Sequence, residues 1–274
     1  MTRVVDVEAL ARLLQDAARA EILPRFRNLG EGDIRSKSEA SDLVTEADEA
    51  AERMIRAGVA VLAPDALFVG EESVAADPAL LARLAGAERA VVVDPVDGTF
   101  NFASGIGAFG VMAAVVEKGE TVAAVIHDPL GNDWLIAEKG AGAFQVAADG
   151  RRVRLKVADP VPLADMIGMA STGFLPKDKK PEILANLAKV RYATSYRCAA
   201  VEYRAFAGGF VHYLMYNKLM PWDHLPGTLI AKEAGAYVAR FDGSPYLPSH
   251  TGGGLLVTPD RDSWDALRRE VFTL

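Results

Sequence analysis

Two early segments of the chain alternate apolar and polar residues at helical spacing. Residues 4 to 27 place apolar side chains three or four positions apart, which predicts an amphipathic helix. Residues 45 to 62 repeat this spacing, and most charges on this second helix, including Glu49, Glu52 and Arg53, are expected on the surface. Residues 30 to 41, which lie between the two, are polar and have no period, so they predict a loop.

Short apolar runs separated by turn residues predict a large antiparallel sheet. Residues 67 to 70 and 90 to 93 are apolar throughout, as expected of strands covered on both faces. Two longer runs flank a four-residue polar turn that contains Gly119, which predicts a β-hairpin. We expect the strands of this sheet at residues 67 to 70, 90 to 93, 109 to 116, 121 to 127, 134 to 137, 142 to 146 and 151 to 157.

Pro160 and Pro162 mark the expected boundary between two lobes of one compact unit, residues 1 to 158 and 159 to 274. Beyond it, strand and helix patterns alternate. The expected strands are 167 to 171, 192 to 195 and 210 to 216, and the expected helices are 181 to 189, 199 to 207, 226 to 235 and 262 to 272. Pro226 is expected in the first turn of its helix and Asp262 at the N-cap of the last helix.

Composition and charge exclude several classes of protein. A chain of 274 residues with 50% hydrophobic content buries a large core, and a net charge of −7 argues against a basic surface for nucleic acid or anionic membranes. Cys198 is the only cysteine, so no intrachain disulfide forms. No run approaches the roughly 20 apolar residues of a spanning helix, and charges interrupt the N-terminal segment, so we expect a cytoplasmic protein without a signal peptide.

The buried strand at residues 90 to 93 runs directly into two carboxylates, Asp94 and Asp97. Gly98 then allows a sharp turn into a short helix, whose first backbone N–H groups attract phosphate. Two ionised carboxylates this close repel each other unless they share a proton or a cation, and Mg²⁺, Mn²⁺ and Ca²⁺ all prefer carboxylate oxygens. The alternative is structural, with one aspartate capping a helix and the other serving a turn.

Two more acidic positions follow the same pattern. Glu71 and Glu72 come directly after the predicted strand at 67 to 70, and Asp223 precedes a Pro and Gly turn before a predicted helix. Three separate acidic sites at the ends of elements favour one shared explanation, a metal centre.

Four acidic blocks of this chain, in this order, resemble motifs of the inositol monophosphatase-like phosphatases, which are Mg²⁺-dependent and typically lithium-sensitive. They are residues 42 to 48 (DLVTEAD), 69 to 73 (VGEES), 94 to 102 (DPVDGTFNF) and 222 to 227 (WDHLPG), and the resemblance extends from about Lys37 to Pro259. It implies an α+β fold, a layered αβαβα sandwich of the sugar-phosphatase type, with a large antiparallel sheet, a smaller mixed sheet and helices between them.

The resemblance also implies the residues of a metal site. Two or three Mg²⁺ ions, for which Mn²⁺ could substitute, would be held by Glu71, Asp94, Asp97, Asp223 and the carbonyl of Val96. It further implies that Lys37 lies near the metals.

The same resemblance implies the residues that carry out the chemistry. Thr99, helped by Glu71 and Asp48, would position and activate the water that attacks phosphorus. The amides of Gly98 and Thr99 would bind phosphate oxygens. A water near Asp223 would protonate the leaving oxygen.

The implied reaction is hydrolysis of a small phosphate monoester, and inositol phosphate is the first substrate expected. The enzyme is expected to be a cytoplasmic homodimer. Tyr216 occupies the position where inositol-specific members carry a glutamate that contacts a substrate hydroxyl. Arg197, in the neighbouring substrate segment, meets either a second anionic group of the substrate or an acid on the surface. Fructose bisphosphate, 3′-phosphoadenosine nucleotides and histidinol phosphate therefore stay open as substrates.

Other mechanisms fit the sequence less well. Haloacid dehalogenase-type phosphatases need a second aspartate two residues after the first, and Asp94 and Asp97 are three apart. No phosphate-binding Gly-x-x-x-x-Gly-Lys-Ser/Thr loop is present, which excludes that class of kinases and NTPases. A metal-binding regulatory protein without activity would be expected to have lost Thr99 or Glu71, and both are present. His224 is expected to point away from Asp223 and is not counted as a ligand.

Overall fold

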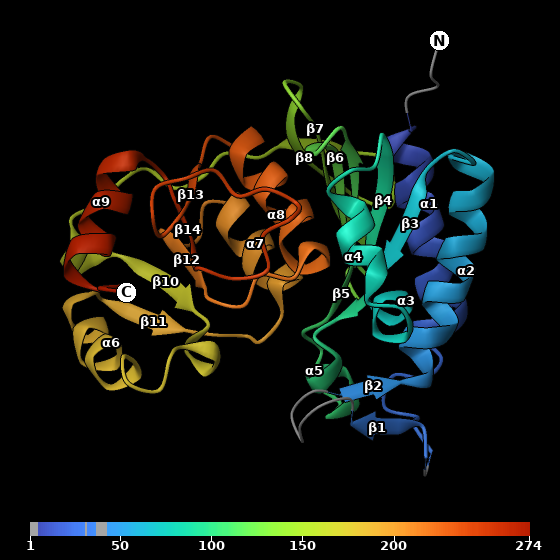
Figure 1. Cartoon of the computed structure of the whole chain (residues 1–274), viewed down its shortest axis with the longest axis horizontal. Helices are drawn as coiled ribbons and strands as arrows, with labels where there is room; N and C mark the ends of the chain where they lie inside the picture. Colours follow the sequence, from blue (N-terminus) through green and yellow to red (C-terminus); the bar gives the residue numbers. More distant parts are fainter. Residues whose placement is uncertain (1–4, 31, 37–42) are drawn as a thin grey trace.

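Two large β-sheets and three layers of helices build most of the molecule, seen in a computed structural model that describes residues 5 to 30, 32 to 36 and 43 to 274 (Figure 1). In these residues the larger sheet has seven strands, in the order β3-β4-β5-β6-β7-β8-β9. Only β3 and β4 are parallel, and every other neighbouring pair is antiparallel. The bounds are β3 Leu67–Gly70, β4 Arg89–Asp97, β5 Gly110–Glu117, β6 Glu120–Asp128, β7 Asp133–Glu138, β8 Gly142–Val146 and β9 Arg152–Arg154.

The smaller sheet has five strands in the described residues, in the order β11-β10-β12-β14-β13, and mixes parallel with antiparallel pairs. Its strands are β10 Ile167–Ala170, β11 Tyr192–Thr194, β12 Tyr213–Tyr216, β13 Tyr237–Arg240 and β14 Leu255–Thr258. The strands of the two sheets do not mix along the chain. The division into lobes between residues 158 and 159 stays a prediction.

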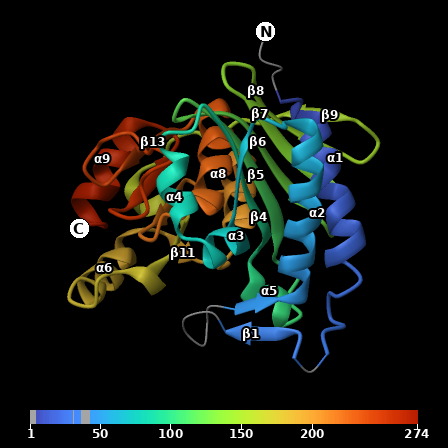
Figure 2. The same ribbon diagram turned by 45° about the vertical axis from the view of Figure 1, so that its right-hand side comes forward.

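Helices cover both outer faces and fill the space between the sheets (Figure 2). Helices α1 (Val7–Ala17) and α2 (Glu46–Leu62) pack on the outer face of the larger sheet, and a π-helical turn, Ala18–Ile22, extends α1. Helices α7 (Ala199–Ala207) and α8 (Pro221–Glu233) lie between the sheets, while α6 (Lys180–Asn186) and α9 (Arg261–Glu270) cover the far face of the smaller one. This is the expected αβαβα sandwich.

The position of strand β5 between two layers of helices explains why its sequence is apolar without alternation. Met112, Ala114 and Val116 belong to the core shared with α7 and α8, whereas Val111 and Ala113 belong to the core under α1 and α2. Both faces of the strand are therefore buried, and an apolar residue is favoured at every position. No helix in the described part of the chain is long and apolar enough to cross a membrane.

The remaining elements of the described residues are short. They are the hairpin of β1 (Ile34–Ser36) and β2 (Leu43–Thr45), the helices α3 (Glu71–Ala76), α4 (Ala79–Leu84) and α5 (Thr99–Ala103), and the 3₁₀ turns Leu163–Asp165, Thr172–Phe174 and Leu187–Lys189. Helix α3 begins at the residue that follows β3, and only Gly98 separates the end of β4 from the start of α5.

Several boundaries differ from the expectations. The segment 30 to 41, expected as a loop, contains β1, whose three residues are all exposed. Helix α8 begins at Pro221, so Pro226 lies inside it and not in its first turn. The N-cap of α9 is Asp260, which accepts from the Ser263 amide, and Asp262 lies in the first turn. Strands β13 and β14 were not expected at all.

Candidate active site

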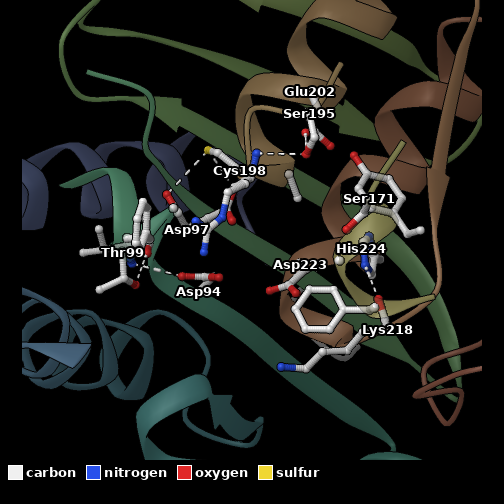
Figure 3. Close-up of a pocket in the computed structure, with 18 of the residues that line it drawn as sticks. Asp94, Asp97, Thr99, Ser171, Ser195, Cys198, Glu202, Lys218, Asp223 and His224 are labelled. Atoms are coloured by element: carbon white, nitrogen blue, oxygen red, sulfur yellow. Dashed lines mark hydrogen bonds between the residues drawn. The ribbon is translucent and has the colours of Figure 1, made fainter. Parts of the chain in front are cut away.

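A cavity of about 840 Å³ opens between the two sheets and is lined by residues from the ends of β4, β12, α5, α7 and α8. Three aspartates meet on one side of it, Asp94 and Asp97 from β4 and Asp223 from the first turn of α8 (Figure 3). One carboxylate oxygen from each lies within 4.8 Å of the others. The structure thus brings together three of the four acidic residues predicted to bind metal.

A break in the strand register makes this arrangement within β4. Its pairing with β5 shifts between Asp94 and Asp97, where Pro95 supplies no N–H to the ladder. The Val96 amide donates to Asp94 Oδ1 at 3.0 Å, which fixes that carboxylate against its own backbone. Gly98 then adopts φ +88°, and a β-carbon there would lie 2.8 Å from the Ala108 carbonyl oxygen. Both the turn and the close packing therefore require glycine.

Burial and mutual repulsion make the ionised forms of the three carboxylates unfavourable without a bound cation. Burial, followed by the charges of Glu71 and Asp97, raises the pKa of Asp94 well above its usual range. Burial and the same neighbouring charges do so for the pKa of Asp223. Burial raises the pKa of Asp97 to about 6, although the Ala200 amide and the Cys198 thiol oppose the shift. Hard divalent cations bind carboxylate oxygens and would remove this repulsion, so the donor set fits such an ion.

Glu71 is the first residue of α3 and lines the same cavity. A second glutamate, Glu52 of α2, supports this position. It accepts hydrogen bonds from the amides of Glu72 and Ser73, at 2.7 and 2.8 Å, and from the Ser73 hydroxyl. A β-carbon on Gly70 would lie 2.3 Å from the Glu52 carboxyl group, so the glycine makes room for it.

Glu52 was expected on the surface, and this expectation was wrong, because its side chain is only 4% exposed. It lies one turn after Asp48 and one turn before Ile55, both of which are fully buried. That spacing is the signal in the sequence that assigns Glu52 to the inner face of α2.

Thr99 and Asp48 are in direct contact. The Thr99 hydroxyl lies 2.9 Å from Asp48 Oδ1 and 3.0 Å from the Val96 carbonyl, and either acceptor can take its one proton. The other oxygen, Asp48 Oδ2, accepts from both the amide and the hydroxyl of Thr45, the N-cap residue of α2, which forms a capping box there. Burial raises the pKa of Asp48 to about 6, against the opposing effect of the hydrogen bonds from Thr45.

The start of α7 holds Asp97 from the other side of the cavity. Asp97 Oδ2 accepts from the Ala200 amide and from the Cys198 thiol, the latter at 3.1 Å. Burial raises the pKa of the Cys198 thiol well above its ordinary value, so the thiol keeps its proton for this bond. The sequence suggested no site role for Cys198, and the structure places its thiol in contact with a candidate ligand.

Arg197 and Tyr216 both line the cavity, as their predicted roles require. Arg197 is exposed and places its guanidinium carbon 3.8 Å from the centre of the Phe100 ring. Tyr216 is 5% exposed, and its hydroxyl has no well-formed hydrogen bond within the described residues. Beside it lies Glu202, which the sequence did not single out. Glu202 is 1% exposed and accepts from the Ser195 hydroxyl and the Tyr196 amide.

His224 is turned away from the carboxylates (Figure 3). Its Nε2 lies 3.1 Å from the Lys218 carbonyl, which only accepts, so Nε2 carries the proton and Nδ1 is free to accept from the Tyr203 hydroxyl at 3.3 Å. Burial lowers the pKa of His224 to about 4, which keeps the ring neutral near pH 7. His224 is therefore a packing residue. Lys37, predicted near the metals, lies outside the described residues.

Comparisons with known proteins agree with this geometry. A family model described as the inositol monophosphatase family matches residues 4 to 269. A Thermotoga maritima protein named fructose-1,6-bisphosphatase/inositol-1-monophosphatase is 32% identical over 211 residues, covering 77% of this chain and 76% of its own. A Vibrio cholerae protein named Nus factor SuhB is 31% identical over 222 residues, covering 77% and 76%. The solved structure of a Thermotoga maritima IMPase superposes with a TM-score of 0.79 at 25% identity, covering 96% of this chain and 95% of that one.

Proposed function

The chain belongs to the inositol monophosphatase family and is a phosphoric monoester hydrolase, and we propose that it uses Mg²⁺ to hydrolyse a small phosphate monoester by direct attack of water. The observation that carries the proposal is the cluster of Asp94, Asp97 and Asp223, whose carboxylate oxygens lie within 4.8 Å of one another in a cavity that also contains Thr99.

The residues that would hold the metal are Glu71, Asp94, Asp97, Asp223 and the carbonyl of Val96. Their hardness as oxygen donors favours Mg²⁺, with Mn²⁺ as a substitute, and their four negative charges are suited to two or three ions. When bound, such ions neutralise charge on the phosphate and lower the pKa of water so that hydroxide is available near neutral pH.

The chain's own residues position the reactants. We assign Thr99 to the attacking water: its oxygen accepts a hydrogen bond from the water while its own proton is directed to Asp48 Oδ1, 2.9 Å away. A pKa of about 6 lets Asp48 take up a proton near neutral pH. The amides of Gly98 and Thr99 are assigned to the oxygens of the reacting phosphate, and a water beside Asp223 to protonation of the leaving alcohol.

The names of the relatives suggest the first substrates to test, inositol 1-phosphate and fructose 1,6-bisphosphate. Histidinol phosphate and 3′-phosphoadenosine 5′-phosphate complete the panel. Inhibition by lithium, a homodimer and a cytoplasmic location are further expectations from the family. A purely regulatory metal-binding protein is disfavoured, because Thr99 and Asp48 remain in hydrogen-bond contact beside the carboxylates.

The proposal is tested by measuring phosphate release from this panel with Mg²⁺, with Mn²⁺, with a chelator alone, and with Mg²⁺ plus Li⁺. Release that requires the divalent ion supports the proposal. Asp223→Asn should lose most of the activity and still give the wild-type circular dichroism spectrum. Release that persists at an equal rate with the chelator would contradict metal dependence.

A further inference from the structure

Two cationic side chains, Arg197 and Lys218, line the same cavity as the carboxylate cluster. Arg197 lies between β11 and α7, and Lys218 lies between β12 and α8. In the described part of the chain, neither guanidinium nor ammonium group forms an ion pair or a hydrogen bond, although other basic side chains pair with exposed acids. Two unpaired cations beside a predicted phosphate site are available to bind an anion.

Each cation lies over an aromatic ring. The guanidinium carbon of Arg197 is 3.8 Å from the centre of the Phe100 ring, and Lys218 Nζ is 5.2 Å from that of Phe174. The negative face of an aromatic ring attracts a cation without using its N–H donors. Both side chains are therefore held in place while their hydrogen-bond donors stay available. Phe174 is 51% exposed, unusual for a ring whose only task is packing.

The backbone of Arg197 points to the same role. Its φ is 54°, in the left-handed region that glycine enters without cost and that costs other residues about 1–2 kcal/mol. Glycine would satisfy this turn and still allow Cys198 and Ala200 to contact Asp97. Strained backbone of this kind persists where the side chain has a use, and here it brings a guanidinium group to the cavity.

The chemistry of the cavity defines the ligand. The carboxylates and the ions they would hold account for the phosphate that is cleaved, so that group does not need the two further cations that line the same cavity. A guanidinium group matches phosphate geometry with paired N–H donors, and an ammonium group adds a compact charge. A cavity of about 840 Å³ also exceeds the space that one phosphate and its ions fill.

We propose that Arg197 and Lys218 bind a second phosphate group of the substrate, so that the enzyme acts on small molecules that carry two phosphates. The inference rests on the proposed phosphatase function. In the reaction, the oxygen of water forms a bond to one phosphorus, the bond from that phosphorus to the substrate oxygen breaks, and a proton goes to that oxygen. The second phosphate stays on the product and remains bound to Arg197 and Lys218.

Matched pairs of substrates test the proposal. The pairs are fructose 1,6-bisphosphate with fructose 1-phosphate, and 3′-phosphoadenosine 5′-phosphate with adenosine 3′-phosphate, each measured with Mg²⁺. We expect the wild type to prefer at least one bisphosphate over its partner by tenfold or more in kcat/KM. Arg197→Gln and Lys218→Gln should each lose about tenfold on that bisphosphate, mainly through KM, and change little on its partner. Arg151→Gln, an exposed arginine outside the cavity, is the control.

Two kinetic results would overturn the inference. One is a wild type that cleaves inositol 1-phosphate as well as any bisphosphate. The other is an equal loss on both members of a pair, which would assign Arg197 and Lys218 to the reacting phosphate.

Binding of the product provides a readout that does not require turnover. Calorimetry with fructose 6-phosphate and adenosine 5′-phosphate should show about tenfold weaker binding to Arg197→Gln and Lys218→Gln than to the wild type and to Arg151→Gln. Binding that depends on these residues, in a protein that releases no phosphate from any ester, would retain the second-phosphate site and reject the proposed function. Equal binding by all four proteins would reject the site.

Discussion

The carboxylate of Asp48 bonds in two directions, with Oδ1 accepting from the Thr99 hydroxyl at 2.9 Å and Oδ2 from the Thr45 amide at 2.8 Å. The contact with Thr99 lies at the cavity, and the contact with Thr45 lies at the N-terminus of α2. One buried side chain thus connects the start of a helix on the outer face of the larger sheet to the residue that we assign to the attacking water.

Replacing Thr99 tests this assignment. Thr99→Ala should lower kcat by about 10²–10³-fold with little change in KM, because the water loses its acceptor but the phosphate keeps its contacts. Thr99→Ser keeps the hydroxyl and should retain most of the activity. Steady-state kinetics measure both. If Thr99→Ala keeps more than a tenth of the wild-type kcat, Thr99 does not act on the water.

Glu52 should act on metal affinity without touching the metal. Glu52→Gln turns an amide NH₂ toward backbone donors at the start of α3, which displaces Glu71 from the cavity. Titration calorimetry should show Mg²⁺ binding weakened by about 10- to 100-fold. Glu49→Gln, on the same helix and in a partly exposed ion pair with Arg35, is the control and should bind Mg²⁺ normally. Unchanged affinity in Glu52→Gln would show that Glu71 does not depend on it.

Alanine substitutions at two glycines distinguish the effect of backbone strain from the effect of steric overlap. Gly98 and Gly119 both have left-handed φ, +88° and +77°, but only at Gly98 would a β-carbon meet other atoms. Gly119→Ala should cost about 1–2 kcal/mol of unfolding free energy and leave activity intact. Gly98→Ala should cost more and lower activity as well, because the Ala108 carbonyl and Cys198 must move. Urea unfolding and kinetics compare the two variants. Equal stability losses would mean that the turn tolerates the extra atom.

Removing one charge from the carboxylate cluster should stabilise the metal-free protein at high pH. The raised pKa of Asp94 means that folding favours its protonated form. That contribution is fully present below about pH 4, the ordinary pKa of an aspartate, and is lost as the pH rises through the raised pKa of Asp94. Metal-free Asp94→Asn should therefore melt several degrees above metal-free wild type at pH 8, and the difference should vanish near pH 4.

Added Mg²⁺ should reverse this order, because the wild type regains stability through binding and Asp94→Asn does so less. Asp149→Asn, at an exposed turn, is the control and should show no such pH dependence. A melting difference that is the same at pH 4 and pH 8 would show that the Asp94 charge is not what destabilises the metal-free protein.

The layered fold and the larger sheet could be predicted because their signals are local. The unbroken apolar run from Ala90 to Val93 reflects burial on both faces, and the turn around Gly119 fixes the hairpin that follows. Strand β1 gave no such signal, since all three of its residues are exposed and neither face is apolar. Its pairing with β2 and the ion pair between Arg35 and Glu49 hold it in place.

Helix α8 shows how a reliable local rule can mislead. Proline is common in the first turn of a helix, and Pro226 was interpreted in that way, but the helix begins with another proline, Pro221. Pro226 lies one turn further in, where it removes one backbone hydrogen bond. Asp223 consequently projects from a helical turn and not from an extended segment.

The predicted ligand set stays a prediction, and the hydrogen-bond partners of the residues that support it could not be predicted from local patterns. Glu52 is buried because amides 20 and 21 residues away donate to it, and Glu202 because the Ser195 hydroxyl and the Tyr196 amide do. Sequence periodicity reports which face of an element is covered. It does not report whether another segment supplies the partners that make a buried charge tolerable.

The carboxylate cluster combines two residues that precede position 100 with one that follows position 220. Ribosomes make the chain from its N-terminus, so Asp94 and Asp97 emerge well before Asp223 does. A nascent polypeptide consequently lacks the complete cluster until most of it has been translated, and protease cleavage between the two segments would leave neither fragment with all three carboxylates. Phosphatase activity would therefore require that both segments of the chain are present.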